Sequence, residues 1–164
     1  MKIYKISKIN LKDINSYLDT LNKTKSKNSL KKNKIRRIDH YNWWFENIYL
    51  NKYCLIKNQK KIIYFWQKKF NKYNKRYFFS GWWPIEDRLE IVDFMHITNT
   101  LLKLSKNHTH VAIILKENKF SIKLHLYFKF KEIKKTSKFY NQILKIYYKE
   151  KKVPSNHLIM IKKN

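Results

Sequence analysis

The stretch ENKFSIKLHLYFKFKEI, residues 117–133, decides how we interpret the chain. Asn118 is a favourable helix N-cap, and residues 118–128 are predicted to form a short helix after it. Residues 130–135 are predicted to form a strand. Just upstream, HVAIIL at 110–115 is the most apolar strand of the chain and suits the middle of a sheet. The stretch therefore predicts a helix between two strands.

Outward from this stretch, the periodicity of the apolar residues predicts a mixed order of strands and helices over the whole chain. Strands are predicted at 2–9, 53–57, 61–70, 76–83, 110–115, 130–135 and 157–163, and helices at 10–21, 39–50, 85–105, 118–128 and 138–152. The strands between 53 and 83 form an antiparallel meander, while the basic segment 22–37 is expected to be a mobile loop, with contact to an anionic substrate as one use. We expect one α+β domain over residues 1–164.

The charge of the chain is strongly positive, since 38 Lys and Arg stand against 11 Asp and Glu, which gives +27. Codon bias in an AT-rich genome explains part of the lysine excess and the single glycine, but it does not explain the scarcity of acids. Some attraction to anionic ligands is therefore expected. The lysines are nevertheless spread along the chain, as on a solvated surface.

The location expected from the sequence is the cytoplasm. No apolar run reaches the roughly 18 residues that a membrane span needs, and the N-terminal stretch lacks the apolar core of a signal peptide. Cys54 is the only cysteine, which excludes an intramolecular disulfide, and its apolar surroundings indicate a small core residue.

The order of elements and the stretch 117–133 together resemble the GNAT superfamily of acyl-CoA N-acyltransferases. The superfamily has a strand-loop-helix signature of Asn, a small residue, Leu, an aromatic residue and then Gly-Phe before a strand. The residues in register with that signature are Asn118, Ser121, Leu124, His125 and Phe130. Lys129 replaces the glycine, so the helix must end on a non-glycine residue. The resemblance implies a mixed, mostly antiparallel, twisted sheet of about seven strands with helices on both faces.

The resemblance also implies acetyl-CoA as a co-substrate, bound where two neighbouring strands diverge. The first of these strands would be 76–83, whose Gly81 lets backbone approach the pantetheine arm; a bulge or turn before Trp82 is the alternative use of the glycine. The implied cofactor-binding residues are Ser80, Gly81, Trp82, Arg88, Asn118 and Ser121.

The superfamily usually binds the pyrophosphate with a glycine-rich loop at the start of the next helix, and this chain departs from that pattern. Its sequence there is WPIEDRLEI, which predicts Pro84 in the first helical turn and Glu86 and Asp87 beside it. These acids would repel a pyrophosphate, and Arg88 is the cation that compensates. Either the phosphate loop is remodelled and acetyl-CoA still binds, or the loop is lost and acetyl-CoA binding is lost with it. We expect the first, because the motif at Asn118 is retained.

The candidate catalytic residues are His125, His40 and Glu46. His125 stands where superfamily members often have a tyrosine that gives a proton to the departing thiolate, a role that a protonated imidazole can take; packing on a helix is the other use of this residue. Other candidates for the general base are Asp39, Asp93 and His96. The two imidazoles of HTH, 108–110, lack a third ligand nearby in sequence, so no metal site is expected.

A second resemblance concerns the acceptor. HYNWWFEN, residues 40–47, is similar to a helix of members that act on sugars in surface-polysaccharide pathways, and Trp43, Trp44 and Phe45 can form a platform for a sugar ring or anchor the helix to the sheet. The implied reaction is acetylation of an amine on a small acceptor such as an amino sugar nucleotide, by a monomer or homodimer. The alternative is an inactive GNAT-like fold that binds nucleic acid or another polyanion. A purely structural role in polysaccharide assembly is a third interpretation.

Overall fold

The computed structural model describes residues 3–28, 34–47, 50–147 and 156–163. Over these ranges the strands and helices follow the predicted order, which confirms the α+β class. The strands are β1 (Tyr4–Lys8), β2 (Asn51–Lys57), β3 (Lys60–Lys72), β4 (Lys75–Pro84), β5 (Thr109–Leu115), β6 (Lys131–Glu132) and β7 (His157–Lys162). The helices are α1 (Ile14–Asn28), α2 (Arg37–Glu46), α3 (Ile91–Leu104), α4 (Lys119–Tyr127) and α5 (Lys138–Tyr147), with a 3-10 helix (Leu11–Asp13) before α1.

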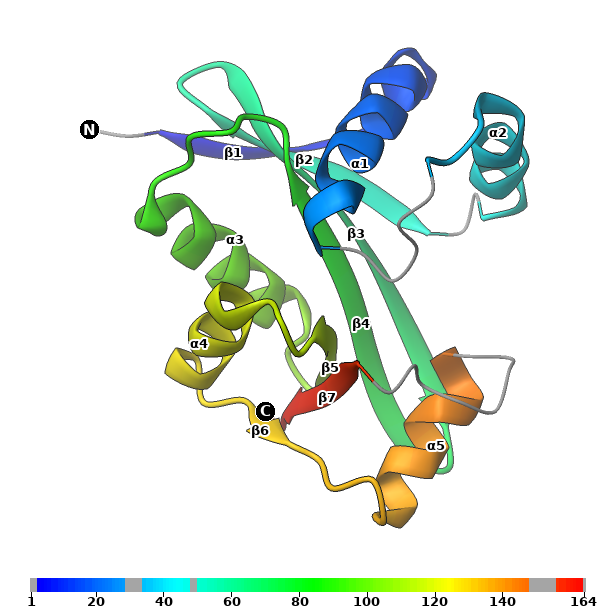
Figure 1. Cartoon of the computed structure of the whole chain (residues 1–164). Helices are drawn as coiled ribbons and strands as arrows, with labels where there is room; N and C mark the ends of the chain where they lie inside the picture. The colour runs from blue at the N-terminus through cyan, green and yellow to red at the C-terminus, as the bar shows by residue number, and fades with distance from the viewer. Residues whose placement is uncertain (1–2, 29–33, 48–49, 148–155, 164) are drawn as a thin grey trace.

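The strands form one sheet in the order β1-β2-β3-β4-β5-β7-β6 (Figure 1). All neighbours are antiparallel except β4 and β5, which are parallel. The predicted meander is therefore β2-β3-β4, and the apolar strand β5 lies inside the sheet as expected.

The parallel pair is short. β4 and β5 are paired only from Tyr77 to Phe79 and from Thr109 to Val111, whereas β3 accompanies β4 as far as Pro84. Beyond Phe79, β4 thus continues without β5 beside it. This divergence creates a gap on the β5 side of β4.

Helices cover both faces of the sheet, as predicted (Figure 1). The side chain of Phe78 packs with Ile97 and Leu101 of α3, while its neighbours Tyr77 and Phe79 pack with α5. This alternation is the period of two that a strand between two apolar layers requires. α1 and α2 lie on the α5 face, where Tyr17 and Trp44 pack against Tyr64. None of the described helices combines the length and the apolar character needed to cross a membrane.

Several boundaries differ from the sequence prediction: α2 is Arg37–Glu46 where 39–50 was predicted, β6 is only Lys131–Glu132 where 130–135 was predicted, and the two largest differences concern the segment 22–37 and the start of α3. α1 continues to Asn28, so the first part of 22–37 is helical and not a loop, while 29–33 lies outside the described residues. The side-chain amide of Asn22 exchanges two hydrogen bonds with the backbone of Ile35, at 2.8 and 3.1 Å, and so ties the chain after this gap to the helix. Lysine and asparagine suit a helix surface as well as a loop, so composition alone misled the prediction.

The start of α3 is the second difference. The helix begins at Ile91, after Glu90, and not directly after Pro84, which is the last residue of β4. The N–H of Ile85 still donates to the Ile62 carbonyl of β3 at 2.8 Å. Glu86 and Asp87 therefore lie in a bend before the helix, and the predicted contribution of these two acids to its first turn is wrong.

Candidate active site

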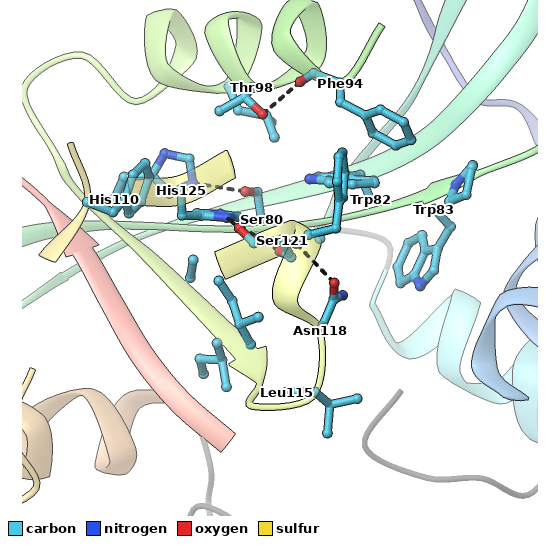
Figure 2. A pocket seen from close by; sticks show the side chains of 18 residues that line it. Ser80, Trp82, Trp83, Phe94, Thr98, His110, Leu115, Asn118, Ser121 and His125 are labelled. Atoms are coloured by element: carbon cyan, nitrogen blue, oxygen red, sulfur yellow. Dashed lines mark hydrogen bonds between the residues drawn. The ribbon is translucent and has the colours of Figure 1, made fainter. Parts of the chain in front are cut away.

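A cavity of about 360 Å³ lies between the diverging ends of β4 and β5, under α3 and α4 (Figure 2). Six of the predicted site residues line it: Ser80, Gly81, Trp82, Asn118, Ser121 and His125. The lining residues that were not among the predicted site residues are Trp83, Pro84, Phe94, Thr98, Leu101, His110, Ala112, Ile113, Ile114, Leu115, Phe120 and Phe130. The described lining contains no carboxylate and no lysine or arginine, so its polar groups are hydroxyls, imidazoles, indole N–H groups, an amide and backbone.

The loop before α4 places Asn118 at the rim of this cavity. The Oδ1 atom of Asn118 accepts the N–H of Ser121 at 3.0 Å, which is the predicted N-cap. At the other end of α4, Lys129 has φ of 63° and Phe130 N–H donates to the His125 carbonyl at 3.0 Å. Lys129 thus adopts the left-handed conformation that normally favours glycine, as the resemblance required.

Gly81 does not serve a bulge or a turn. It is paired with Trp66 in an uninterrupted β3–β4 register, and its φ is not in the left-handed region. A Cβ atom built on Gly81 would lie 2.6 Å from Nε1 of Trp66. The indole of Trp66 therefore accounts for the glycine, and the approach of a ligand to its backbone stays a prediction.

The backbone of Trp82 points into the gap. Ile85 donates to β3, and residues on an antiparallel strand alternate in the side to which their N–H and C=O groups point. The backbone N–H and C=O groups of Gly81 and Trp83 therefore point towards β3, as those of Ile85 do. The backbone N–H and C=O of Trp82 point to the other side, from which β5 has diverged. Trp82 accordingly offers an N–H donor and a C=O acceptor to a ligand between the strands.

His110 forms the buried end of the cavity. Ser105 donates its hydroxyl to the Leu102 carbonyl at 3.0 Å, so its oxygen is left to accept from Nδ1 of His110 at 3.4 Å. Nε2 of His110 is then the acceptor, and the hydroxyl of Ser80 donates to it at 3.0 Å. This series of hydrogen bonds fixes the tautomer of the neutral imidazole, with the proton on Nδ1. Burial, with the nearby His125 and Lys162, lowers the pKa of His110 to about 3.

His125 is also neutral in this environment. Its Nδ1 lies 2.7 Å from the Ser121 carbonyl, which can only accept, so Nδ1 carries the proton and Nε2 has the lone pair. Burial lowers the pKa of His125, although the bond to Ser121 opposes that shift. The ring lies edge-on to Phe130 with centroids 4.8 Å apart. His125 is therefore poised to accept a proton before it can donate one.

The buried imidazole of His110 should make the protein sensitive to acid. Its folded-state pKa lies below the usual 6.5, so the unfolded chain binds the additional proton and stability falls as the pH drops from about 6.5 towards 3. His110→Gln removes that titration. We expect its free energy of unfolding to fall less steeply than that of the wild type, by about 1.4 kcal/mol per pH unit between these limits.

Urea unfolding at a series of pH values measures this difference in slope, with His108→Gln as the matched control. His108 lies two residues away and is only half-buried, with Nδ1 bonded to the Lys106 carbonyl. Equal slopes for His110→Gln and His108→Gln would contradict the assignment of this titration to His110.

Three predicted site residues lie outside the cavity lining: Arg88, His40 and Glu46. Arg88 is exposed in the bend before α3, and Glu46 is exposed at the end of α2. His40 is buried, with Nε2 3.2 Å from the Ile14 carbonyl and its ring stacked with that of Tyr17. His40 thus links α1 to α2, and burial lowers its pKa.

The remaining base candidates have other partners. Asp39 is exposed and paired with Arg36 at 2.8 Å, and His96 stacks on the ring of Tyr4 with centroids 4.0 Å apart. Asp93 is buried and accepts from the hydroxyl of Tyr4 and from Lys57. The described residues contain no cluster of metal-ligating side chains.

The first turn of α3 is occupied by the chain's own acids. Asp93 accepts the N–H of Glu90 at 3.0 Å, and Lys57 lies 2.7 Å from the carboxylate of Glu90. A pyrophosphate at this helix N-terminus would therefore meet two carboxylates. The acids at the start of α3 are thus Glu90 and Asp93, and not Glu86 and Asp87 as predicted.

The aromatic helix α2 contributes mainly to packing. Trp44 is buried, Trp43 is half-buried and Phe45 is exposed. The Nζ atom of Lys52 lies 4.6 Å from the ring centroid of Trp44 and 5.3 Å from that of Trp43. Trp44 thus packs in the core, whereas Phe45 is exposed to solvent.

No protein-family model and no curated protein matches the sequence. Solved structures do match over nearly the whole chain. A domain from Methanocaldococcus jannaschii has a TM-score of 0.76 at 19% identity, covering 99% of each chain. A nucleotide-linked sugar GNAT has a TM-score of 0.66 at 12% identity, covering 97% of this chain and 85% of its own.

A GNAT superfamily phosphinothricin acetyltransferase from Sinorhizobium meliloti, in complex with acetyl-CoA, has a TM-score of 0.64 at 10% identity. The match covers 97% of this chain and 87% of that one. The predicted resemblance in fold is confirmed: the chain has the fold of the GNAT acetyltransferases.

Proposed function

We propose that the protein is an acyl-CoA-dependent N-acyltransferase that transfers an acetyl group from acetyl-CoA to an amine of a small acceptor. The observation that carries the proposal is the gap between β4 and β5, where pairing ends after Phe79 and a cavity opens beside the Asn118 loop. A fold alone supports many functions. Here the cavity lies where the resemblance requires it and is lined by residues of the matching motif.

The pantetheine arm fits the polar groups of this cavity. Its amides need both a donor and an acceptor, and the backbone of Trp82 offers both on the open side of β4. The side-chain amide of Asn118 uses Oδ1 for the cap, which leaves its NH₂ group to donate. The other predicted cofactor-binding residues, Ser80, Gly81 and Ser121, lie along the same cavity.

The phosphates of acetyl-CoA must be held differently from the superfamily pattern. The acids of the first turn of α3 oppose a pyrophosphate there. Arg88, exposed in the bend before α3, is the cation we assign to this role. A side chain would thus replace the backbone N–H groups of a glycine-rich loop.

His125 is the group we assign to proton transfer. The attacking amine must lose a proton, and the departing thiolate must gain one. Nε2 of His125 has the lone pair that can take the proton from the amine nitrogen, and the imidazolium so formed, with its lowered pKa, is a stronger acid than a free imidazolium and can give the same proton to the sulfur. In this relay His125 first accepts a proton and then donates it, whereas the protonated histidine expected from the sequence would donate first.

The acceptor class we propose is the amino group of a nucleotide-linked sugar. A structural neighbour at 12% identity is described as a nucleotide-linked sugar GNAT, and the exposed ring of Phe45 on α2 can stack on a sugar. His40 is assigned to holding α2 against α1, and Glu46, at the end of α2, to binding the acceptor. Transfer to such an amine would be followed as release of CoA thiol.

The test is calorimetric titration of the protein with acetyl-CoA at physiological and at higher salt. We expect one-to-one, micromolar binding that persists at higher salt. In Asn118→Ser the hydroxyl keeps the helix cap but the amide donor is lost, so affinity should fall about tenfold while stability is retained. Asn10→Ser, which makes the same replacement at the N-cap that accepts the Lys12 N–H before α1, is the matched control.

Heat that disappears with salt would overturn this function and support the polyanion-binding alternative, because counterion release makes such binding steeply salt-dependent. Equal affinities of wild type and Asn118→Ser would remove Asn118 from the site.

A further inference from the structure

The turn between β3 and β4 has an unusual residue at its tip. Tyr73 and Asn74 form a two-residue hairpin loop with φ of 54° and 55°. Both angles are left-handed, which is typical of Asn-Gly and costly for a tyrosine. Tyr73 is 49% exposed, so burial does not offset this cost. A strained aromatic residue at an exposed tip calls for a function.

The tip is surrounded by positive charge. Lys69, Lys72, Lys75 and Arg76 are exposed on either side of the turn. No Asp or Glu occurs in residues 60–85. Asn71, Lys72, Tyr73, Asn74, Lys75 and Arg76 line a hollow of about 340 Å³. The tip therefore combines an exposed ring, cations and amides in one concave surface.

The start of α5 extends this charged surface. Nζ of Lys75 lies 4.8 Å from the ring centroid of Phe139, and the rings of Tyr77 and Phe139 are 5.7 Å apart. The hairpin end consequently lies beside α5 (Figure 1). Lys134, Lys135 and Lys138 are exposed in and before the first turn of this helix.

The charge is segregated in a way that codon bias does not explain. The ion pairs found among the described residues use Asp13, Asp39, Asp87, Glu90 and Asp93. All these acids belong to the α1, α2 and α3 ends of the molecule, and none to the hairpin or to α5. Residues 60–85 and α5 thus carry cations without acids, and the acid nearest in sequence to the start of α5 is Glu132 of β6.

We propose that the hairpin tip, defined as residues 69–76, is a docking site for single-stranded nucleic acid. Its cations would contact phosphates, and the ring of Tyr73 would stack on an unpaired base. An unpaired base is required because a duplex hides the faces of its bases. The tip is separate from the acyl-transfer cavity, since the stretch of β4 from Lys75 to Gly81 spans about 20 Å at the roughly 3.3 Å rise per residue of a strand.

Fluorescence anisotropy of the full chain with a labelled oligothymidylate tests this proposal. Lys72→Gln/Lys75→Gln/Arg76→Gln should raise the dissociation constant at least about tenfold. It should also make the plot of log affinity against log salt concentration shallower, with a slope smaller by about 0.7 for each phosphate that the variant no longer neutralises. The matched control is Lys5→Gln/Lys8→Gln/Lys12→Gln, which removes the same charge from exposed positions in and near β1. The control should change affinity much less.

Tyr73→Asn isolates the ring from the charge. Asparagine tolerates the left-handed conformation, so thermal stability should be kept or increased while affinity falls about tenfold because the ring no longer stacks on a base. Equal losses of affinity in the tip and control triple variants, or undiminished binding by Tyr73→Asn, would overturn the proposal. Competition by heparin as effective as that by the oligothymidylate would indicate a general polyanion surface and would also overturn it.

Discussion

Asp93→Ala should lower the free energy of unfolding by about 3 kcal/mol, because this carboxylate joins three elements in the interior. Its side chain is 1% exposed. It accepts the Tyr4 hydroxyl of β1 at 2.6 Å, Lys57 of β2 at 2.9 Å and the Glu90 N–H of α3 at 3.0 Å. Removal of the carboxylate leaves these donors without their shared acceptor.

Urea unfolding of Asp93→Ala, compared with Asp87→Ala, measures this effect. Asp87 also pairs with a lysine, Lys23 at 2.8 Å, but its side chain is 73% exposed, so its loss should cost less than about 1 kcal/mol. Similar losses of stability in both variants would show that burial does not decide the strength of these ion pairs.

The pH dependence of Asp93 has the same direction in stability as that of His110, although the fold keeps Asp93 charged and His110 neutral. Burial acts to raise the pKa of Asp93, but bonds from Tyr4, Lys57 and the Glu90 N–H outweigh it and hold the pKa below its usual value. The stability that Asp93 contributes is therefore present above about pH 3.8 and is lost as the pH falls through the folded-state pKa.

The second large effect is expected at Gly81. Gly81→Ala should lower the free energy of unfolding by about 2 kcal/mol, because the new Cβ would lie 2.6 Å from Nε1 of Trp66. Trp66 belongs to the layer packed against α5, so its ring cannot move away freely. In the Trp66→Leu background the same substitution should be nearly neutral, giving a coupling energy above about 1 kcal/mol.

Acetyl-CoA titration of the double variant then separates the two uses of the glycine. Binding equal to that of Trp66→Leu would mean that Gly81 serves only the indole. A further loss of affinity would support the predicted approach of the pantetheine arm to this backbone. Destabilisation that is the same with and without Trp66 would contradict the steric explanation.

The sequence was sufficient for the elements whose signals are local. The apolar run that became β5, the Asn118 cap and the left-handed exit at Lys129 all depend on residues close to one another in the chain. The same locality explains why part of the cavity lining could be predicted. The predicted lining residues lie in two short stretches, Ser80–Trp82 and Asn118–His125, and both were identified through the one resemblance.

Pro84 shows what the sequence could not supply. Proline commonly opens a helix, which led to the wrong start for α3. In the alternation of β4, however, the missing N–H of Pro84 falls on the side of the gap, so the ladder to β3 loses nothing and the strand continues. That advantage exists only because β5 has already diverged, which is a property of the folded sheet.

His110 was missed as a cavity residue for a related reason. The motif at 108–110 suggested a pair of imidazoles on one strand face, yet the partners of His110 come from Ser80 on β4 and Ser105 after α3. Residues that meet only through tertiary packing leave no spacing signal. The position of His110 at the start of the most apolar strand was the available indication of a buried polar group.

The short ladder between β4 and β5 also separates the sheet into two hydrogen-bonded parts. The meander β1–β4 is assembled from strands adjacent in sequence, whereas β5, β7 and β6 form a second hydrogen-bonded unit. Only the Tyr77–Phe79 ladder joins them within the described sheet. We therefore expect this ladder to be the place where the sheet opens most easily, so that widening the gap for a bulky ligand would strain a few backbone bonds there and leave the other ladders intact.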